Sequence, residues 1–118
     1  MTLSGVTLDA PDARELAAFY QRLLGWTVIE DETDWIVLGN PAGGPNLAFQ
    51  TEKAYVRPVW PARPGDQQMS MHLDIRVNDL AEAGAHAERA GATMADFQPQ
   101  DDVRVFQDPD GHPFCLFL

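Results

Sequence analysis

The sequence is poor in positive charge. Its 118 residues include 8 Lys and Arg against 18 Asp and Glu, which gives a formal net charge of −10. Nucleic acids and anionic membranes are bound through concentrated Lys and Arg, so neither is expected as a partner of this chain. A neutral or cationic small molecule matches the charge better, although solubility alone also explains an acidic surface.

Cysteine and long apolar runs are scarce as well. Cys115 is the single cysteine, which excludes an internal disulfide and agrees with a reducing compartment. No stretch approaches the roughly 20 apolar residues of a membrane span. Residues 1–5 (MTLSG) lack the basic and apolar regions of a secretion signal. We therefore expect a cytoplasmic protein.

The chain does contain an internal repeat. Residues 5–12 (GVTLDAPD) resemble residues 72–79 (HLDIRVND), and residues 35–45 (WIVLGNPAGGP) match residues 103–113 (VRVFQDPDGHP) with Pro and Gly in register. Half of a 118-residue chain would be marginally stable alone, so the halves are expected to share one domain. We predict a single domain over 1–118, with module 1 at about 1–51, a proline-rich connector at 52–68 and module 2 at about 69–118.

Each module has the pattern of one strand, one helix and three further strands. A capping Asp, a Glu three residues later and a final Gly are typical of the helix ends. These residues are Asp12, Glu15 and Gly25 in module 1, and Asp79, Glu82 and Gly91 in module 2. The later strands are expected at 26–30, 35–39 and 46–51, and at 93–97, 103–107 and 114–118. The acidic run at 30–34 is expected to be a solvated loop.

The repeat, the helix ending Phe19-Tyr20 to Leu24-Gly25 and the turn at 108–112 (DPDGH) together resemble a known superfamily. This is the glyoxalase, bleomycin-resistance and extradiol-dioxygenase superfamily, also called vicinal oxygen chelate. Residues 72–74 (HLD) and 114–116 (FCL) resemble its small glyoxalase-like branch.

The resemblance implies an α+β fold in which two tandem βαβββ modules pair their sheets into a ligand cup, with helices on the outer faces. It also implies a homodimer. It does not fix a reaction, because the superfamily includes lyases, isomerases, oxygenases, thiol transferases and proteins that sequester drugs.

Active members of this superfamily usually hold a divalent metal through the first and last strands of each module. The resemblance places these positions at Gly5, Leu47, His72 and Cys115. Gly and Leu have no donor side chain, whereas such an ion needs three or more N or O donors. Gln50 would reach the first-half position only by a register slip, and an odd slip turns a side chain to the opposite face. No cofactor is therefore expected, with His72 as the only strong remnant ligand, although a divalent metal is not excluded.

Two residues of module 2 are candidates for catalysis. Strand alternation places His72, Asp74 and Arg76 on one face. His72 would act as a base or sole imidazole ligand with help from Asp74, or it would simply be solvated. Cys115 lies in an apolar strand, where we expect a small buried hydrophobe, although ligand and nucleophile roles stay open. His112 is interpreted as a turn residue and His86 as a solvated helix residue.

The candidate ligand-binding residues are mostly aromatic or hydrogen-bonding. They are Thr7, Asp9, Trp35, Phe49, Gln50, Trp60 and Cys115. Aromatic side chains suit a planar ligand, with core or dimer packing as the alternative. We predict a glyoxalase-like binding protein that sequesters an aromatic or cationic compound. The alternatives are a lyase or isomerase that uses His72, a dioxygenase-like enzyme, and a degenerate domain kept for assembly or regulation.

Overall fold

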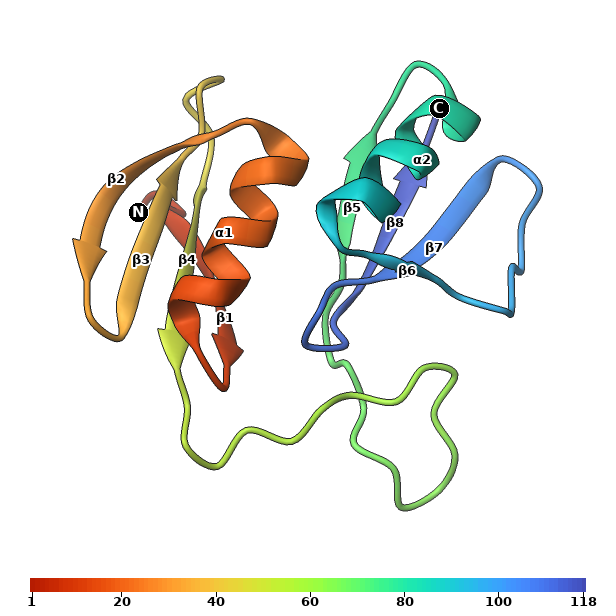
Figure 1. Cartoon of the computed structure of the whole chain (residues 1–118), viewed down its shortest axis with the longest axis horizontal. Helices are drawn as coiled ribbons and strands as arrows, with labels where there is room; N and C mark the ends of the chain where they lie inside the picture. Colours follow the sequence, from red (N-terminus) through yellow and green to blue (C-terminus); the bar gives the residue numbers. More distant parts are fainter. The chain divides into compact units, whose positions relative to one another are not determined.

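The computed structural model describes all residues 1–118, which divide into two compact units, Met1–Tyr55 and Val56–Leu118. Each unit contains one helix and one four-stranded sheet (Figure 1). The predicted α+β class with tandem βαβββ modules is confirmed. Most of the connector belongs to the second unit, since that unit begins at Val56. The pairing of the two sheets into one ligand cup stays a prediction, as does the homodimer.

Unit 1 contains the first five elements of the chain. They are β1 (Gly5–Ala10), α1 (Ala13–Leu24), β2 (Thr27–Glu32), β3 (Trp35–Gly39) and β4 (Asn46–Thr51). The strand order in the sheet is β1-β4-β3-β2. β1 runs parallel to β4, and the other neighbouring strands are antiparallel.

Unit 2 repeats this topology after a segment without helix or strand. Its elements are β5 (Leu73–Arg76), α2 (Leu80–Ala90), β6 (Thr93–Met94), β7 (Val103–Gln107) and β8 (Pro113–Phe117). The strand order is β5-β8-β7-β6, and only β5 and β8 are parallel. Neither helix of the protein has the length and apolar content that a membrane-spanning helix requires.

Both helices begin and end at the residues that the sequence indicates. The Asp12 carboxylate accepts hydrogen bonds from the backbone N–H of Arg14 at 2.9 Å and Glu15 at 3.4 Å. Gly25 closes α1 with φ of 70°, a left-handed conformation that costs glycine little. In α2, Asp79 accepts from the backbone N–H of Glu82 at 2.8 Å, and Gly91 follows the last turn. These contacts satisfy backbone groups that a helix end leaves without partners.

The core of each unit lies between its helix and one face of its sheet. In unit 1, the buried Leu16, Phe19 and Tyr20 project from α1, and Tyr20 stacks on Phe49 of β4 with ring centroids 5.4 Å apart. The buried residues of α2 are smaller, namely Gly84, Ala87 and Ala90. A Cβ atom at Gly84 would lie 3.3 Å from Phe106, so α2 packs closely on the sheet.

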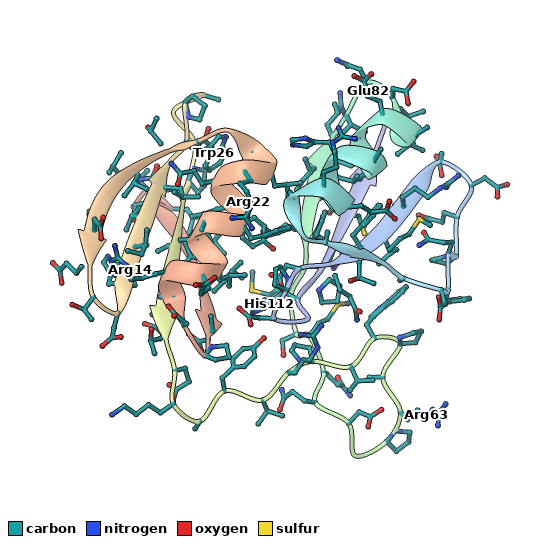
Figure 2. The ribbon with its side chains drawn as sticks, in the orientation of Figure 1. Arg14, Arg22, Trp26, Arg63, Glu82 and His112 are labelled. Atoms are coloured by element: carbon teal, nitrogen blue, oxygen red, sulfur yellow. The ribbon has the colours of Figure 1, made fainter.

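Two strands end two or more residues away from the predicted positions, and β8 is shifted by one residue. β2 continues to Glu32, so the acidic run expected as a loop is mostly strand. Arg14 of α1 (Figure 2) stabilises this strand by donating to the Asp31 carboxylate at 2.6 Å and to the Glu32 carbonyl at 3.0 Å. β6 ends at Met94 instead of residue 97. The Gln98 side chain bonds both the N–H and the carbonyl of Val105 at 2.9 Å, which replaces further strand pairing.

The two halves also differ in one turn. Residues 40–45 join β3 to β4, whereas the shorter segment 108–112 joins β7 to β8. Thr7 and Asp74 each stand five residues before the Asp that caps the following helix. Thr7 lies opposite Ala48, and Asp74 lies opposite Cys115. The residue equivalent to Cys115 is therefore Ala48 and not Leu47, which corrects the sequence alignment by one position.

Candidate functional site

Each sheet has a face that the helix of its own unit does not cover, here called the helix-free face. Side chains alternate along a strand, so the residues opposite the core face project there. In unit 2, His72, Asp74 and Arg76 are exposed on this face, while Leu73 and Ile75 alternate with them and are half-buried. The predicted placement of His72 and Asp74 on one polar face is consistent with this pattern.

Strand pairing brings three potential donor side chains together on this face. Asp74 lies directly opposite Cys115, and the His72 Nε2 atom is 3.3 Å from Asp74 Oδ1. The donor atoms of His72, Asp74 and Cys115 all lie within 4.8 Å of one another. His72 and Asp74 have side chains that are 39% and 61% exposed. We call these three residues the unit 2 cluster.

Cys115 is half-buried, which corrects the expectation of a buried hydrophobe. Its neighbours Phe114 and Leu116 project into the core with 0% and 2% exposure, so alternation turns Cys115 to the helix-free face. Partial burial raises the pKa of the Cys115 thiol, and the charge and hydrogen bond of Asp74 raise that pKa further. The thiol is thus kept protonated at neutral pH, which argues against a nucleophilic role.

This pKa shift gives a testable prediction for cysteine reactivity. Because the thiolate is the reactive species, alkylation of Cys115 by iodoacetamide should require a higher pH than alkylation of a free cysteine. An Asp74→Asn variant should react faster at neutral pH, since it lacks the charge that raises the thiol pKa. The rate profile of intact protein, followed by mass spectrometry, reports Cys115 alone because the chain has one cysteine. An Asp101→Asn variant is the control, and equal rates in both variants would contradict the role of Asp74.

A hollow of about 330 Å³ adjoins the unit 2 cluster. Besides the cluster, it is lined by Gln100, Asp102, Val103, Phe117 and Leu118. The sequence patterns did not single out these residues. Strand alternation would have placed Phe117, two residues after Cys115, on the same face of the strand as Cys115. The Arg76 guanidinium lies 5.4 Å from the centroid of the Phe117 ring. Gln100 and Asp102 lie in a segment without helix or strand, where no residue periodicity predicts which way a side chain points.

In unit 1, Thr7, Asp9, Trp35 and Gln50 share the helix-free face. Asp9 lies opposite Gln50 on β4, and Gln50 lies opposite Trp35 on β3. The Gln50 amide donates to Asp9 Oδ1 at 2.6 Å, and the Trp35 indole N–H donates to Glu30 at 2.8 Å. The register places Gln50 on the same face as Ala48, two residues before it. Counting from Leu47 predicts Gln50 on the opposite face, and this expectation does not hold.

The remaining aromatic candidates lie elsewhere. Phe49 belongs to the core of unit 1, where it is fully buried against Tyr20. Its position therefore agrees with core packing, which was the alternative to ligand binding. Trp60 belongs to the connector part of unit 2, and its ring centroid lies 5.9 Å from that of Phe97. The candidate residues are thus distributed over four places in the structure, namely the two helix-free faces, the core of unit 1 and the connector part of unit 2.

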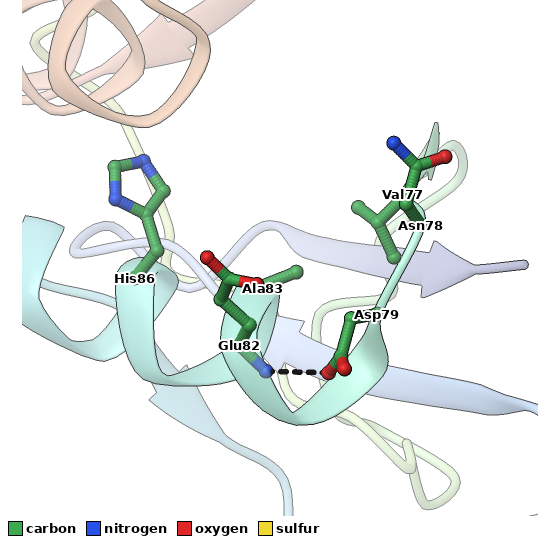
Figure 3. Close-up of a pocket in the computed structure, with 6 residues that line it drawn as sticks. All are labelled: Val77, Asn78, Asp79, Glu82, Ala83 and His86. Atoms are coloured by element: carbon green, nitrogen blue, oxygen red, sulfur yellow. Dashed lines mark hydrogen bonds between the residues drawn. The ribbon is translucent and has the colours of Figure 1, made fainter.

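The other two histidines lie in different surroundings. His112, labelled in Figure 2, is in the turn before β8, as interpreted from the sequence, with Nδ1 2.7 Å from Asp108 Oδ2. His86 lines a hollow of about 300 Å³ beside the first turns of α2 (Figure 3). The Asp79 carboxylate in that hollow is occupied by the helix cap. This hollow therefore resembles a capped helix end more than a reactive site.

The superfamily's metal positions do not fit these residues. Read by strand register, they are Gly5, Ala48, His72 and Cys115. Gly5 and Ala48 have no side-chain donor, so two of four ligands are missing for a divalent ion that prefers N and O donors. Asp74 adds one carboxylate beside His72 and Cys115 but does not replace the unit 1 ligands.

Comparison with known proteins gives a match over nearly the whole chain. A family model described as a glyoxalase-like domain matches residues 5–117. A glyoxalase/bleomycin resistance protein/dioxygenase family enzyme from Burkholderia phytofirmans aligns with a TM-score of 0.75 and 18% identity, covering 98% of this chain and 97% of that one. A comparison with curated proteins finds no match.

Two further solved structures share the fold. A glyoxalase family protein from Enterococcus faecalis aligns with a TM-score of 0.69 and 23% identity, covering 97% of this chain and 94% of that chain. The fosfomycin resistance protein FosX from Mesorhizobium loti aligns with a TM-score of 0.69 and 14% identity, covering 97% and 88%. At these identities the structures support the fold alone.

Proposed function

Since this chain belongs to the glyoxalase-like domain family, within the vicinal oxygen chelate superfamily, we propose that it binds and sequesters a small aromatic or cationic compound without a metal. The observation that carries the proposal is the composition of the two helix-free faces. They hold hydrogen-bonding and aromatic side chains such as Gln50, Asp74 and Trp35, while two of the superfamily's four metal positions have no donor.

The charges favour a cationic ligand. The chain has a net charge of −10, and the hollow beside the unit 2 cluster includes the carboxylates of Asp74 and Asp102. An acidic surface raises the local concentration of cations and accelerates their association. Cys115 adds no negative charge there at neutral pH, since a thiol is ordinarily protonated and burial and Asp74 raise its pKa further. The face thus offers a neutral thiol, an imidazole and carboxylates for hydrogen bonding.

Sequestration is tested by calorimetry of the purified protein against a panel of aromatic and cationic antibiotics. We expect at least one compound to bind tighter than about 1 mM, which corresponds to roughly −4 kcal/mol. A substitution on the face that holds the compound, Gln50→Ala for unit 1 or Asp74→Asn for unit 2, should weaken that binding about fivefold, because it removes a polar contact worth on the order of 1 kcal/mol.

The matched control variants are Gln21→Ala and Asp101→Asn. Both residues are exposed, and neither lines the hollow beside the unit 2 cluster, so their substitution should leave affinity unchanged. Absence of any binding tighter than about 1 mM across the panel would refute sequestration. Equal losses in the control variants would refute the placement of the ligand on the helix-free faces.

The contact between His72 and Asp74 favours a second candidate function, that of a lyase or isomerase. A carboxylate 3.3 Å from Nε2 holds the proton on that nitrogen and leaves Nδ1 as the basic atom of the ring. A base placed in this way removes a proton from a carbon next to a carbonyl group. The Asp74 carboxylate would stabilise the imidazolium that forms, and His72 would return the proton to the product.

The test of this second function is hydrogen exchange in a panel of hydroxy ketones, followed by proton NMR in D₂O. If His72 is the base, His72→Ala should slow protein-dependent exchange by 10²–10⁴-fold, the usual contribution of general base catalysis. His86→Ala is the control because His86 lies on α2, outside the unit 2 cluster. Unchanged exchange in His72→Ala would exclude His72 as the base.

We also propose a homodimer and a cytoplasmic location. The dimer is supported by the superfamily alone, and sedimentation equilibrium measures it directly. An unpaired thiol at Cys115 agrees with a reducing compartment.

A further inference from the structure

A further pocket, with aromatic side chains in its lining, lies along the edge of the unit 2 sheet. β6 is the last strand in the order β5-β8-β7-β6, and the pocket beside it has a volume of about 270 Å³. Trp60 and Pro61 of the connector line it together with Met94 and Phe97. No residue of this pocket also lines the hollow beside the unit 2 cluster. The pocket is therefore separate from the site described above.

Hydrogen bonds hold both walls of this pocket. On the β6 side, the Gln98 amide donates to the carbonyls of Ala95 at 2.8 Å and Val105 at 2.9 Å, which fixes the segment that carries Phe97. On the connector side, the Val59 N–H donates to the Gln67 carbonyl at 2.9 Å, closing the loop that follows Trp60. A pocket whose walls are already fixed loses little conformational entropy when a ligand binds.

The pocket exposes apolar surface that the fold leaves uncovered. Phe97 is 54% exposed and Met94 is 46% exposed, and both lie within one hollow with the half-buried Trp60. Single exposed apolar residues are ordinary, but several gathered around a concave site are typical of ligand binding.

The ring geometry defines how a ligand would lie. The Trp60 and Phe97 centroids are 5.9 Å apart, and the ring planes are tilted by 36°. A third ring between them would need about 7 Å, twice the contact distance of about 3.5 Å between carbon layers. A planar ligand must therefore stack on one face of the aromatic pair instead of entering between the rings.

The polar lining defines the charge of the ligand. Asp96 is the one ionisable residue among those that line the pocket, and Thr93 and Gln107 add neutral hydrogen-bonding groups. No Lys, Arg or His lines it. Aromatic faces and a carboxylate both attract a positive charge. The volume, which is near the lower end for ligand sites, suits about two fused rings.

We propose that the Trp60–Phe97 pocket binds a small planar aromatic cation by stacking, with Asp96 as its counter-ion. The proposal rests on the proposed function as a binder of aromatic or cationic compounds, and it adds a specific site and ligand class. It adds a second binding site outside the helix-free faces, so the two proposals can fail separately.

The test uses N-methylquinolinium as the probe, with neutral quinoline as its matched analogue. The chain has three tryptophans, so a ¹H–¹⁵N spectrum gives three indole signals, and Trp60→Phe identifies that of Trp60. We expect N-methylquinolinium to shift the Trp60 signal with a Kd on the order of 0.5 mM, and to leave the signals of Trp26 and Trp35 in place. Quinoline should bind about tenfold more weakly.

Three variants test the individual contacts. Phe97→Leu should weaken binding of both probes about fivefold, since it keeps apolar bulk but removes the stacking ring. Asp96→Asn should reduce the preference for the cation, because only the attraction of the ring faces remains, whereas the control Asp101→Asn should preserve it. Thermal melting confirms that each variant is folded, and Trp60→Phe retains an aromatic ring for the same reason.

Each outcome decides the proposal. A Trp60 signal unmoved by about 5 mM probe would overturn it, as would a cation preference in Asp96→Asn that equals that of the unmodified protein. A shift of the Trp35 signal alone would overturn it while supporting ligand binding at the helix-free face of unit 1. Absence of any shift, together with no calorimetric binding by the antibiotic panel, would refute both this pocket and the proposed function.

Discussion

An Asp108→Ala variant is expected to lose about 3 kcal/mol of unfolding free energy, because buried hydrogen-bonded carboxylates are costly to remove. The Asp108 side chain is 0% exposed. Its Oδ1 atom accepts from the backbone N–H of Asp110 at 2.9 Å and of His112 at 3.0 Å, and its Oδ2 lies 2.7 Å from His112 Nδ1. Alanine leaves all three groups without this acceptor. Urea denaturation followed by circular dichroism measures the loss.

Two further variants separate the causes of this loss. Asp108→Asn keeps an oxygen for the turn N–H groups and should lose only about 1 kcal/mol. Asp101→Ala removes an exposed carboxylate and should change the unfolding free energy by less than about 0.5 kcal/mol. If Asp108→Ala were as stable as Asp101→Ala, the turn before β8 would not depend on this carboxylate.

A Phe49→Ala variant is expected to lose about 4 kcal/mol, the usual cost of emptying a Phe site in a packed core. Phe49 is 0% exposed and stacks on Tyr20 beneath α1. The substitution removes this stacking and leaves a cavity that the surrounding side chains refill only in part. The unfolding free energy from urea denaturation reports the effect on unit 1.

Phe97→Ala provides the matched control for Phe49. The same side chain is removed, but Phe97 is 54% exposed, so a loss below about 1 kcal/mol is expected. Similar losses in both variants would contradict the assignment of Phe49 to the core. A stable Phe49→Ala protein with weakened ligand binding would instead support the ligand-binding interpretation of Phe49.

The sequence was most informative where single residues end an element. Asp12 and Gly25 delimit α1, and Asp79 and Gly91 delimit α2, because capping chemistry is local and specific to residue type. The bounds of β3, β4 and β7 also agree with the predicted ranges. Turn residues on either side of these strands determine where pairing stops.

The sequence was less informative where a side chain replaces backbone pairing. β6 was expected to continue to residue 97 on the basis of its residue pattern, but the Gln98 amide occupies both polar groups of Val105. A glutamine side chain that bonds the backbone of the next strand leaves no periodic signal in the sequence. The same limit applies to Asp31 and Glu32, which extend β2 by pairing with Ile36 and Trp35 of β3 and also contact Arg14 of α1.

Part of the candidate site could be predicted from alternation alone. It placed His72 and Asp74 on one polar face, but the approach of Cys115 depends on the pairing of β5 with β8, which are far apart in the chain. The apolar composition of its strand predicted that Cys115 is buried. Its exposure is instead decided by the face of the sheet to which its side chain points. The Trp60–Phe97 pair was not predictable, since both residues lie outside regular elements.

The longer turn at residues 40–45 has a consequence for any attempt to redesign this protein. A histidine or carboxylate introduced at Leu47 would project into the core of unit 1, where Leu47 is buried, and would be expected to destabilise the fold. The same side chain at Ala48 would lie beside Thr7, its partner on β1, on the helix-free face of unit 1. The length of the turn before the last strand thus decides which residues of that strand reach the helix-free face. An engineered donor functions only at one of those positions.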